Sequence, residues 1–172
     1  VYNEVPYCRA IWRGWDSAEW KDGGLWQRKT PLEWYQHRVL PHAALLRRLN
    51  IVVMTDNEAV VDDMTPYGEW MAKAIEFAAA DNIQVAVGRS STGTPRETPH
   101  PGASKNNYQQ LESMYRALNQ FGGVLSPNEY FERSPQLSAG HLFRYQNYWK
   151  AMQELGLKPP PTVIGEYGLA YQ

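Results

Sequence analysis

Short apolar segments alternate with amphipathic segments along this chain, and the spacing between them is close to constant. The apolar segments are rich in β-branched or aromatic residues and end in glycine or polar residues, as β-strands do. They span residues 7–14, 50–57, 83–90, 123–131 and 161–168. The last four begin 33, 40 and 38 residues apart, about the length of one strand and one helix. Strands joined by helices pair in parallel, so the pattern predicts an α/β fold with a parallel sheet.

Amphipathic segments fill the gaps between the predicted strands. The first, residues 31–49, begins with Pro31 behind Thr30 as its N-cap, and Pro41 is expected to kink or split it. Three further helices each carry an apolar stripe at helical spacing. The stripes are Met71, Ala74, Ile75 and Ala78 within 68–80, Leu111, Met114, Tyr115 and Leu118 within 107–120, and Leu142, Tyr145, Trp149, Met152 and Leu155 within 139–155.

Residues 1–172 are predicted to form a single domain, and two architectures fit the alternation. An open doubly wound sheet fits in 172 residues, whereas a complete barrel of eight strand–helix units needs roughly 200–250 residues. The strands read as continuous apolar runs, which is typical of a parallel sheet buried on both faces. No glycine-rich phosphate-binding motif occurs, which weakens the case for an open nucleotide-binding sheet.

Charge and composition exclude several classes of function. The net charge is −1, which gives no electrostatic basis for binding nucleic acid or an anionic membrane, and no apolar run approaches a membrane span. Cys8 is the single cysteine, so an internal disulfide is excluded. His37, His42, His100 and His141 do not have metal-ligand spacing. We therefore expect neither a metal nor another cofactor.

Polar residues follow or end the predicted strands. In a parallel α/β fold the functional residues gather at the carboxyl ends of the strands. Two of these residues, Glu58 and Glu166, are interpreted as a pair of facing carboxylates. Such a pair suits glycoside hydrolysis, because one group must be protonated to donate to the leaving oxygen while the other must be ionised. The full set comprises Arg13, Trp15, Asp56, Asn57, Glu58, Arg89, Ser90, Ser91, Asn128, Glu129, Tyr130, Glu166 and Tyr167.

The stretches VVMTDNEA, residues 52–59, and PTVIGEYGLA, residues 161–170, carry a family resemblance. They resemble the β/α-barrel glycoside hydrolases of the large retaining clan, which have Asn-Glu at the end of the fourth strand and Glu at the end of the seventh. The resemblance implies a partial (β/α)-barrel covering about strands three to seven. It also implies that Glu58 is the acid/base, that Glu166 is the nucleophile, and that Asn57 contacts the sugar 2-hydroxyl.

The same resemblance implies a substrate-binding set around the two glutamates. Tyr130 would lie beside the nucleophile and Arg13 would support its carboxylate. Arg89 and Asn128 are added to the set from their positions at the ends of the two intervening predicted strands. Sugar rings would stack on Trp15, or on Trp12, Trp20 or Trp26. The segments SSTGTP, residues 90–95, and GGVLSPNEYF, residues 122–131, also look like loops of bacterial and phage-associated glycosidase-like proteins.

Structural interpretations of the same acids stay open. Glu58 could be an acid favoured at a helix N-terminus, and Glu166 could form a salt bridge with Arg13 or Arg89. Glu129 is a rival carboxylate, although only one of Glu129 and the adjacent Tyr130 can face the barrel axis.

The predicted function is that of a glycoside hydrolase acting on a polysaccharide or glycan. The alternatives are a non-catalytic carbohydrate-binding module of a phage or cell-surface assembly and a structural subunit. The expected partners are a carbohydrate substrate and further chain segments or a partner that complete the barrel. The chain begins with Val rather than Met, so we expect a processed form or a piece of a longer protein. The resemblance points to an extracellular or virion-associated location, which the sequence leaves undecided.

Overall fold

The computed structural model describes residues 10–13, 25–55, 61–89, 95–99, 101–132 and 143–170 of this chain. Its strands are β1 (Ile11–Arg13), β2 (Val52–Met54), β3 (Val85–Val87), β4 (Val124–Leu125), β5 (Asn128–Glu132) and β6 (Glu166–Ala170). Its helices are α1 (Leu25–Arg28), α2 (Pro31–Trp34), the π-helix η2 (Tyr35–Val39), the 3₁₀-helix η3 (Leu40–His42), α3 (Ala43–Leu49), α4 (Thr65–Ala80), α5 (Asn107–Gln110), α6 (Glu112–Phe121) and α7 (Arg144–Glu154). Helices alternate with parallel strands along the described part of the chain, so its organisation is broadly α/β.

Neighbouring strands in space follow one another in chain order. The first sheet has the order β1-β2-β3-β4 and the second pairs β5 with β6, with all pairs parallel. An isolated parallel bridge between Leu125 and Thr162 joins β4 to the segment that leads into β6. The order therefore never reverses among the described strands, in contrast to a doubly wound sheet, where it reverses at a switch point. These strands do not close into a barrel.

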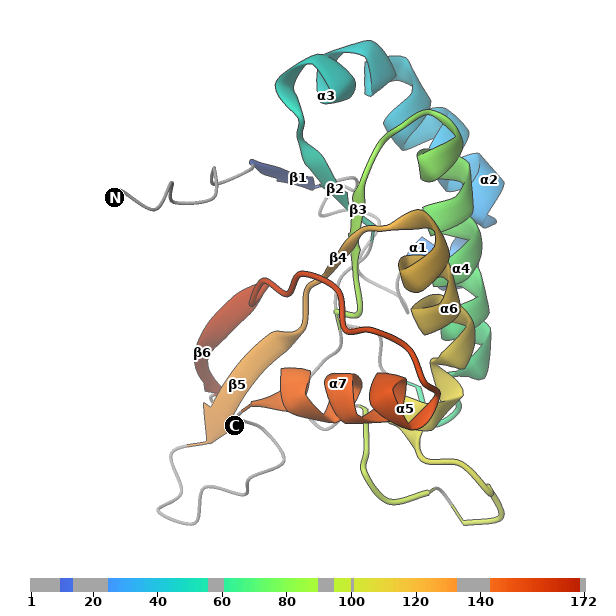
Figure 1. Ribbon diagram of the computed structural model, residues 1–172, viewed down its shortest axis with the longest axis vertical. Coiled ribbons are helices and arrows are strands. Elements are labelled where there is room, and N and C mark those ends of the chain that lie inside the picture. Colours follow the sequence, from blue (N-terminus) through green and yellow to red (C-terminus); the bar gives the residue numbers. More distant parts are fainter. Residues whose placement is uncertain are drawn as a thin grey trace.

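The predicted strand 123–131 is divided into β4 and β5 by Ser126 and Pro127. The Ser126 N–H still donates to the Val87 carbonyl at 2.7 Å, but Pro127 has no N–H to continue the ladder with β3. From Asn128 onward the chain pairs instead with β6, the strand that follows α7. One extended segment thus serves as the edge of the first sheet and as half of the second (Figure 1).

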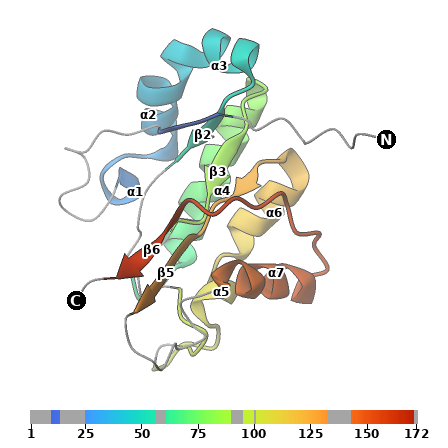
Figure 2. The ribbon, with the colours of Figure 1, turned by 90° about the vertical axis from the view of Figure 1, so that its left-hand side faces the viewer.

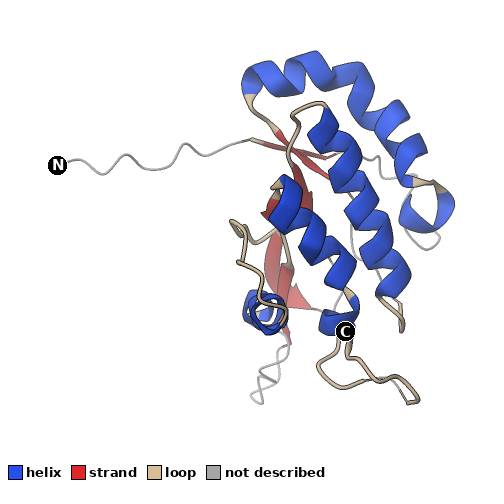
Figure 3. Ribbon diagram, turned by 45° about the vertical axis from the view of Figure 1, so that its right-hand side comes forward, coloured by secondary structure: helices blue, strands red, loops and turns tan. Residues whose placement is uncertain are grey.

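The helices lie on one face of the strands, and we call this the helix-covered face. Figure 2 shows the strands in front and α4 behind them. Figure 3, from a different direction, shows the helices together on one side of the strands. Val53, Val85, Val87 and Leu125 point toward the helices and join one buried cluster with their apolar stripes. Burial of this cluster supplies the main stabilising contribution, at about 25 cal/mol per Å² of apolar surface.

Residues that alternate with these point to the other side of the sheet, which we call the opposite face. Val52, Ala86 and Val124 form a second buried cluster there, with the partly buried Ile11 packed against it. The strands are therefore apolar on both faces near their amino ends, as predicted from their continuous apolar runs.

Residues 31–49 form the helical segment that Pro41 was predicted to kink or split. Thr30 and Glu33 form a reciprocal capping box, in which Glu33 Oε2 accepts from the Thr30 N–H at 2.7 Å. Around Pro41, the α-helix gives way to a π-helix and a 3₁₀-helix before α3 resumes. Pro41 cannot donate the usual i to i−4 bond, so the prediction is confirmed.

The predicted stripes of α4 and of the α5–α6 segment are all buried. The stripe of α7 agrees with the prediction only in part. Met152 is buried as predicted, Leu155 is partly buried against the same cluster, and Leu142 lies outside the described residues. Tyr148, Ala151 and Met152 are its buried apolar residues, whereas Tyr145 and Trp149 are half-buried. The Tyr148 hydroxyl donates to the Gly88 carbonyl at 2.9 Å, which holds this side chain toward the end of β3.

Gly88, the residue after β3, does not continue the alternation of that strand. Val87 already faces the helices, and a Cβ on Gly88 would also point there, 2.8 Å from Leu125 Cδ1. Gly88 has φ of 89°, a conformation that side chains with a Cβ disfavour. Positions 87 and 88 thus both point toward the helix-covered face. The side chain of the next residue, Arg89, lies on the opposite face, where it contacts Met54.

We expect Gly88→Ala to lower the free energy of unfolding by at least about 2 kcal/mol, since it adds an overpacked methyl group to an unfavourable φ. Gly102→Ala is the matched control, because Gly102 has φ of 88° and no heavy atom within 4 Å of an added Cβ. The control should cost about 1 kcal/mol. Denaturant unfolding measures both, and equal losses would show that the Gly88 contact is not tight.

Candidate functional site

Three predicted site residues, Trp15, Asn57 and Glu58, lie outside the described residues. The strand that leads to Glu58 is β2, and Thr55 follows it as a buried residue whose hydroxyl donates to the Ala86 carbonyl at 3.2 Å. The carboxyl end of β2 is thereby fixed to β3 up to Thr55, three positions before Glu58.

Three more predicted site residues are placed by their backbone in strands. Arg13 ends β1, Tyr130 is the third residue of β5, and Glu166 opens β6. Glu166 was predicted near the end of a strand over residues 161–168. In the structure it is the first residue of β6, where the regular pairing with β5 begins. The backbone register pairs Glu166 with Asn128.

A one-residue bulge at Gly165 sets this register. Asn128 comes three residues after Leu125, whereas its partner Glu166 comes four residues after Thr162, the partner of Leu125. The second segment therefore has one residue in excess. The Gly165 N–H donates to the Pro127 carbonyl at 2.8 Å, which leaves Gly165 as the extra residue.

Gly165 lies against a polar cluster on the opposite face, composed of Arg89, Ser126 and Asn128. A Cβ at position 165 would be 2.8 Å from Ser126 Oγ and 3.0 Å from both Arg89 Nε and Asn128 Oδ1. Side-chain Cβ atoms essentially never approach that closely, so glycine is the residue that fits without a shift of its neighbours.

The cluster is buried and hydrogen-bonded. Arg89, Ser126 and Asn128 are 1%, 0% and 0% exposed, and Arg89 Nε donates to Asn128 Oδ1 at 2.9 Å. Another guanidinium N–H is directed to the Met54 sulfur. Ser126 Oγ has no hydrogen-bond partner in the described part of the chain. Of the predicted substrate-binding residues, the structure thus brings Arg89 and Asn128 together.

Ser126 and Gly165 were absent from the predicted site, although the sequence carries a signal for each. Ser126 is two residues before Asn128, so the period of a strand places both on one face. Gly165 immediately precedes the candidate nucleophile, and an isolated glycine in a strand pattern suggests a bulge or a close approach.

The rival carboxylate, Glu129, has a structural role. It is 3% exposed, and its two oxygens accept from the backbone N–H groups of Arg144 and Tyr145 at 3.1 and 3.2 Å. The N-cap residue Phe143 makes no side-chain capping bond. Glu129, which lies on β5, caps α7 in its place. It therefore points to the helix-covered face, away from Asn128.

Two of the candidate sugar platforms also belong to the core. Trp12 packs edge-on against His42 with ring centroids 5.2 Å apart, and Trp26 packs edge-on against Tyr67 at 5.7 Å. Both are partly buried against the cluster beneath the helices. Of the other two candidates, Trp20 also lies outside the described residues.

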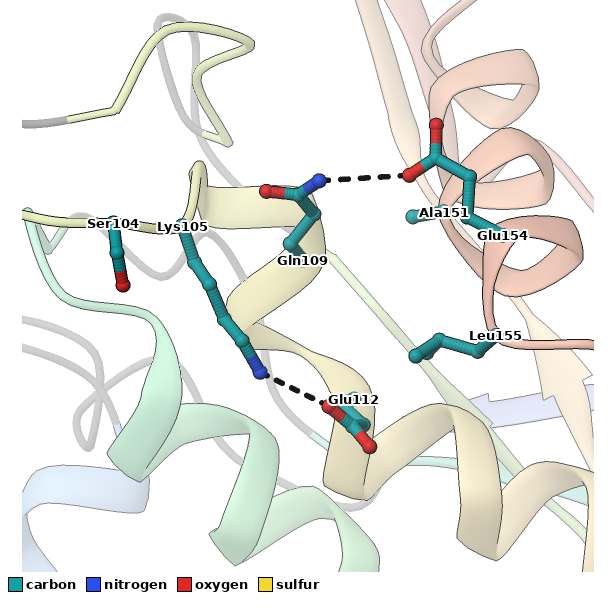
Figure 4. A pocket seen from close by; sticks show the side chains of 7 residues that line it. All are labelled: Ser104, Lys105, Gln109, Glu112, Ala151, Glu154 and Leu155. Carbon is teal, nitrogen blue, oxygen red and sulfur yellow. Dashed lines mark hydrogen bonds and ion pairs between the residues drawn. The ribbon is translucent and has the colours of Figure 1, made fainter.

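A pocket of about 320 Å³ lies between α5, α6 and α7, within the helix layer (Figure 4). Two of its charged groups are paired, with Lys105 Nζ 3.0 Å from Glu112 Oε2, and Gln109 Nε2 donates to Glu154 Oε2 at 3.5 Å. Hydrogen bonds from Arg116 and Lys105 lower the pKa of the Glu112 carboxyl. An adjoining pocket of about 200 Å³ shares Gln109, Ala151 and Glu154. Neither pocket is lined by the polar cluster. The lining residues in Figure 4 are Ser104, Lys105, Gln109, Glu112, Ala151, Glu154 and Leu155.

Comparisons with models of protein families, with curated proteins and with solved structures found no match to this chain. Among the described residues, no three histidine, cysteine or carboxylate side chains are grouped to hold a metal ion. None of the described helices has the length and apolar character needed to cross a membrane.

We expect Glu129→Gln to lower the free energy of unfolding by about 0.5–2 kcal/mol, because the charge that caps α7 is removed. Glu154→Gln is the matched control at the other end of the same helix, where an exposed acid opposes the helix dipole. It should change stability by less than about 0.5 kcal/mol. Denaturant unfolding of both variants measures the difference, and an unaltered Glu129→Gln protein would contradict the capping role.

Proposed function

We propose that this chain is part of a (β/α)-barrel, about strands three to seven, of a retaining glycoside hydrolase that acts on a polysaccharide or glycan. Glu58 is the acid/base and Glu166 the nucleophile. The observation that carries the proposal is the register of Glu166 with Asn128, beside a buried polar cluster on the face that the helices leave uncovered.

The arrangement of strands and helices supports a barrel segment over a doubly wound sheet. Strand order follows chain order, and the helices lie on one face. In a barrel the helices form an outer ring and the opposite face of the sheet becomes the packed interior. The remaining strands would come from further chain segments or from a partner.

The two ends of the opposite face differ in chemistry, as the interior of a barrel enzyme requires. Near the amino ends of the strands it carries Val52, Ala86 and Val124. Toward the carboxyl ends it carries Arg89 and Asn128, bonded to each other. Active sites of barrel enzymes lie at the carboxyl ends of the strands.

In the proposed reaction, the Glu58 carboxyl protonates the glycosidic oxygen while the Glu166 carboxylate attacks the anomeric carbon. The bond to the leaving group breaks and a glycosyl ester forms on Glu166. The Glu58 carboxylate then removes a proton from water, which attacks the anomeric carbon and releases Glu166. Retention requires the two carboxyl groups to be about 5 Å apart. Asn57 contacts the sugar 2-hydroxyl, and Tyr130 and Arg13 lie beside the nucleophile.

The test uses a panel of aryl glycosides with the wild-type chain, Glu58→Gln and Glu166→Gln. We expect loss of acid/base catalysis to lower kcat/KM by about 10²–10⁴-fold, and loss of the nucleophile to lower it at least as far. A 2-fluoro glycoside should leave a glycosyl ester on Glu166, which peptide mass spectrometry locates.

Glu154→Gln is the control, since its carboxylate is exposed on α7 and should leave turnover unchanged. Turnover that survives replacement of both glutamates would contradict the mechanism. Glycan binding that persists without any turnover by the wild-type chain would instead favour a non-catalytic carbohydrate-binding module.

A further inference from the structure

We propose that Tyr67 and Tyr148 are positioning residues for Arg89, and that their hydroxyls act by holding the main chain just after β3. Arg89 belongs to the proposed substrate-binding set, so this assignment rests on the proposed function. The effect of the two hydroxyls on Arg89 can be measured whether or not the chain hydrolyses a glycan.

Two hydrogen bonds from side chains hold the main chain directly after β3. The Val87 carbonyl, at the end of the strand, accepts a backbone N–H of the neighbouring segment at 2.7 Å. The next carbonyl, of Gly88, accepts from the Tyr148 hydroxyl at 2.9 Å. The carbonyl of Arg89 accepts from the Tyr67 hydroxyl, also at 2.9 Å. Buried carbonyls need a donor, and tyrosine hydroxyls thus supply one to two consecutive residues.

The two tyrosines reach this point from different helices of the same layer. Tyr67 lies in the first turn of α4, and Tyr148 lies on α7. Both side chains are 0% exposed and belong to the cluster beneath the helices. Both donors therefore approach residues 88 and 89 from the helix-covered face, so this stretch of main chain is fixed from that side.

Aromatic packing restricts the movement of both rings. Trp26 packs edge-on against Tyr67 with ring centroids 5.7 Å apart. Tyr108 and Tyr115 pack edge-on against Tyr148 at 5.0 and 6.4 Å. Burial raises the pKa of the Tyr108 and Tyr115 hydroxyls, as expected for surroundings of low polarity. In such surroundings a hydrogen bond is stronger than in water and more costly to lose.

The position of the main chain determines where the guanidinium of Arg89 lies. Gly88 has φ of 89°, and positions 87 and 88 both point toward the helices. The Arg89 side chain therefore lies on the opposite face, where its Nε donates to Asn128 Oδ1 at 2.9 Å. A shift of the main chain here would displace the guanidinium, and small displacements of a group that binds substrate are costly to turnover.

The experiment measures by NMR how fast the Arg89 Nε–H exchanges with solvent. The signal is assigned through the backbone resonances of the same residue. The Thr55 N–H, which donates to the Ala86 carbonyl at 3.2 Å, is the reference for opening of the sheet as a whole. We expect Tyr67→Phe and Tyr148→Phe each to speed exchange of the Nε–H by about tenfold relative to this reference, because each removes one buried hydrogen bond beside it.

Tyr115→Phe is the matched control. Tyr115 is also 0% exposed and packs against the ring of Tyr148, but its hydroxyl has no hydrogen-bond partner in the described part of the chain. Its removal should leave the ratio of the two exchange rates unchanged. If Tyr67→Phe or Tyr148→Phe also leaves the ratio unchanged, even with both protons exchanging faster, the hydroxyl serves stability alone and the positioning role of that tyrosine is overturned.

Aryl glycoside turnover separates this proposal from the function. A changed exchange ratio in a chain without turnover supports the two hydrogen bonds as the hold on Arg89 and removes only the glycosidase. Turnover with an unchanged ratio in both phenylalanine variants removes only the positioning role. Where both hold, each variant should raise KM by about two- to tenfold and change kcat less, because a substrate-binding group acts before the transition state as well as in it.

Discussion

Burial of the helix stripes against one face of the strands is the constraint on which the rest of the structure depends. Because β1, β2, β3 and β4 are parallel and each crossover returns on the same side, the strands follow chain order and their carboxyl ends meet at one edge. That arrangement leaves the other face for short apolar residues at one end and polar residues at the other. The predicted site residues Arg89 and Asn128 lie on that face.

The elements that could be predicted from sequence are those set by local pattern. The stripe of α4 follows from the spacing of Met71, Ala74, Ile75 and Ala78, and the break near the middle of segment 31–49 follows from Pro41, which lacks an N–H. The stripe of α7 was predicted only in part: Met152 is buried as expected, but Tyr148 is buried as well and donates a hydrogen bond to the carbonyl of Gly88, sixty residues earlier. Local periodicity contains no information about such a partner.

For the candidate site, the sequence predicts polar residues at the strand ends but not the face of the sheet that each residue uses. Asn128 and Glu129 are adjacent in sequence, yet one bonds Arg89 and the other caps α7 on the far side of the sheet. Alternation separates these two, but the register beyond them also depends on the bulge at Gly165, and a bulge is a property of two paired strands rather than of one. A glycine within a predicted strand suggests a bulge, but it does not indicate which neighbouring strand will be the partner.

The bulge at Gly165 has a consequence for how related chains could vary. Deleting residue 165 would shorten the strand by the one step that it has in excess over its partner, so the glutamate that follows would still come to lie opposite Asn128. Replacing it by a larger residue would instead force a side chain into Ser126 and Arg89. In evolutionary terms a one-residue gap at this position is the conservative change, and a substitution the drastic one.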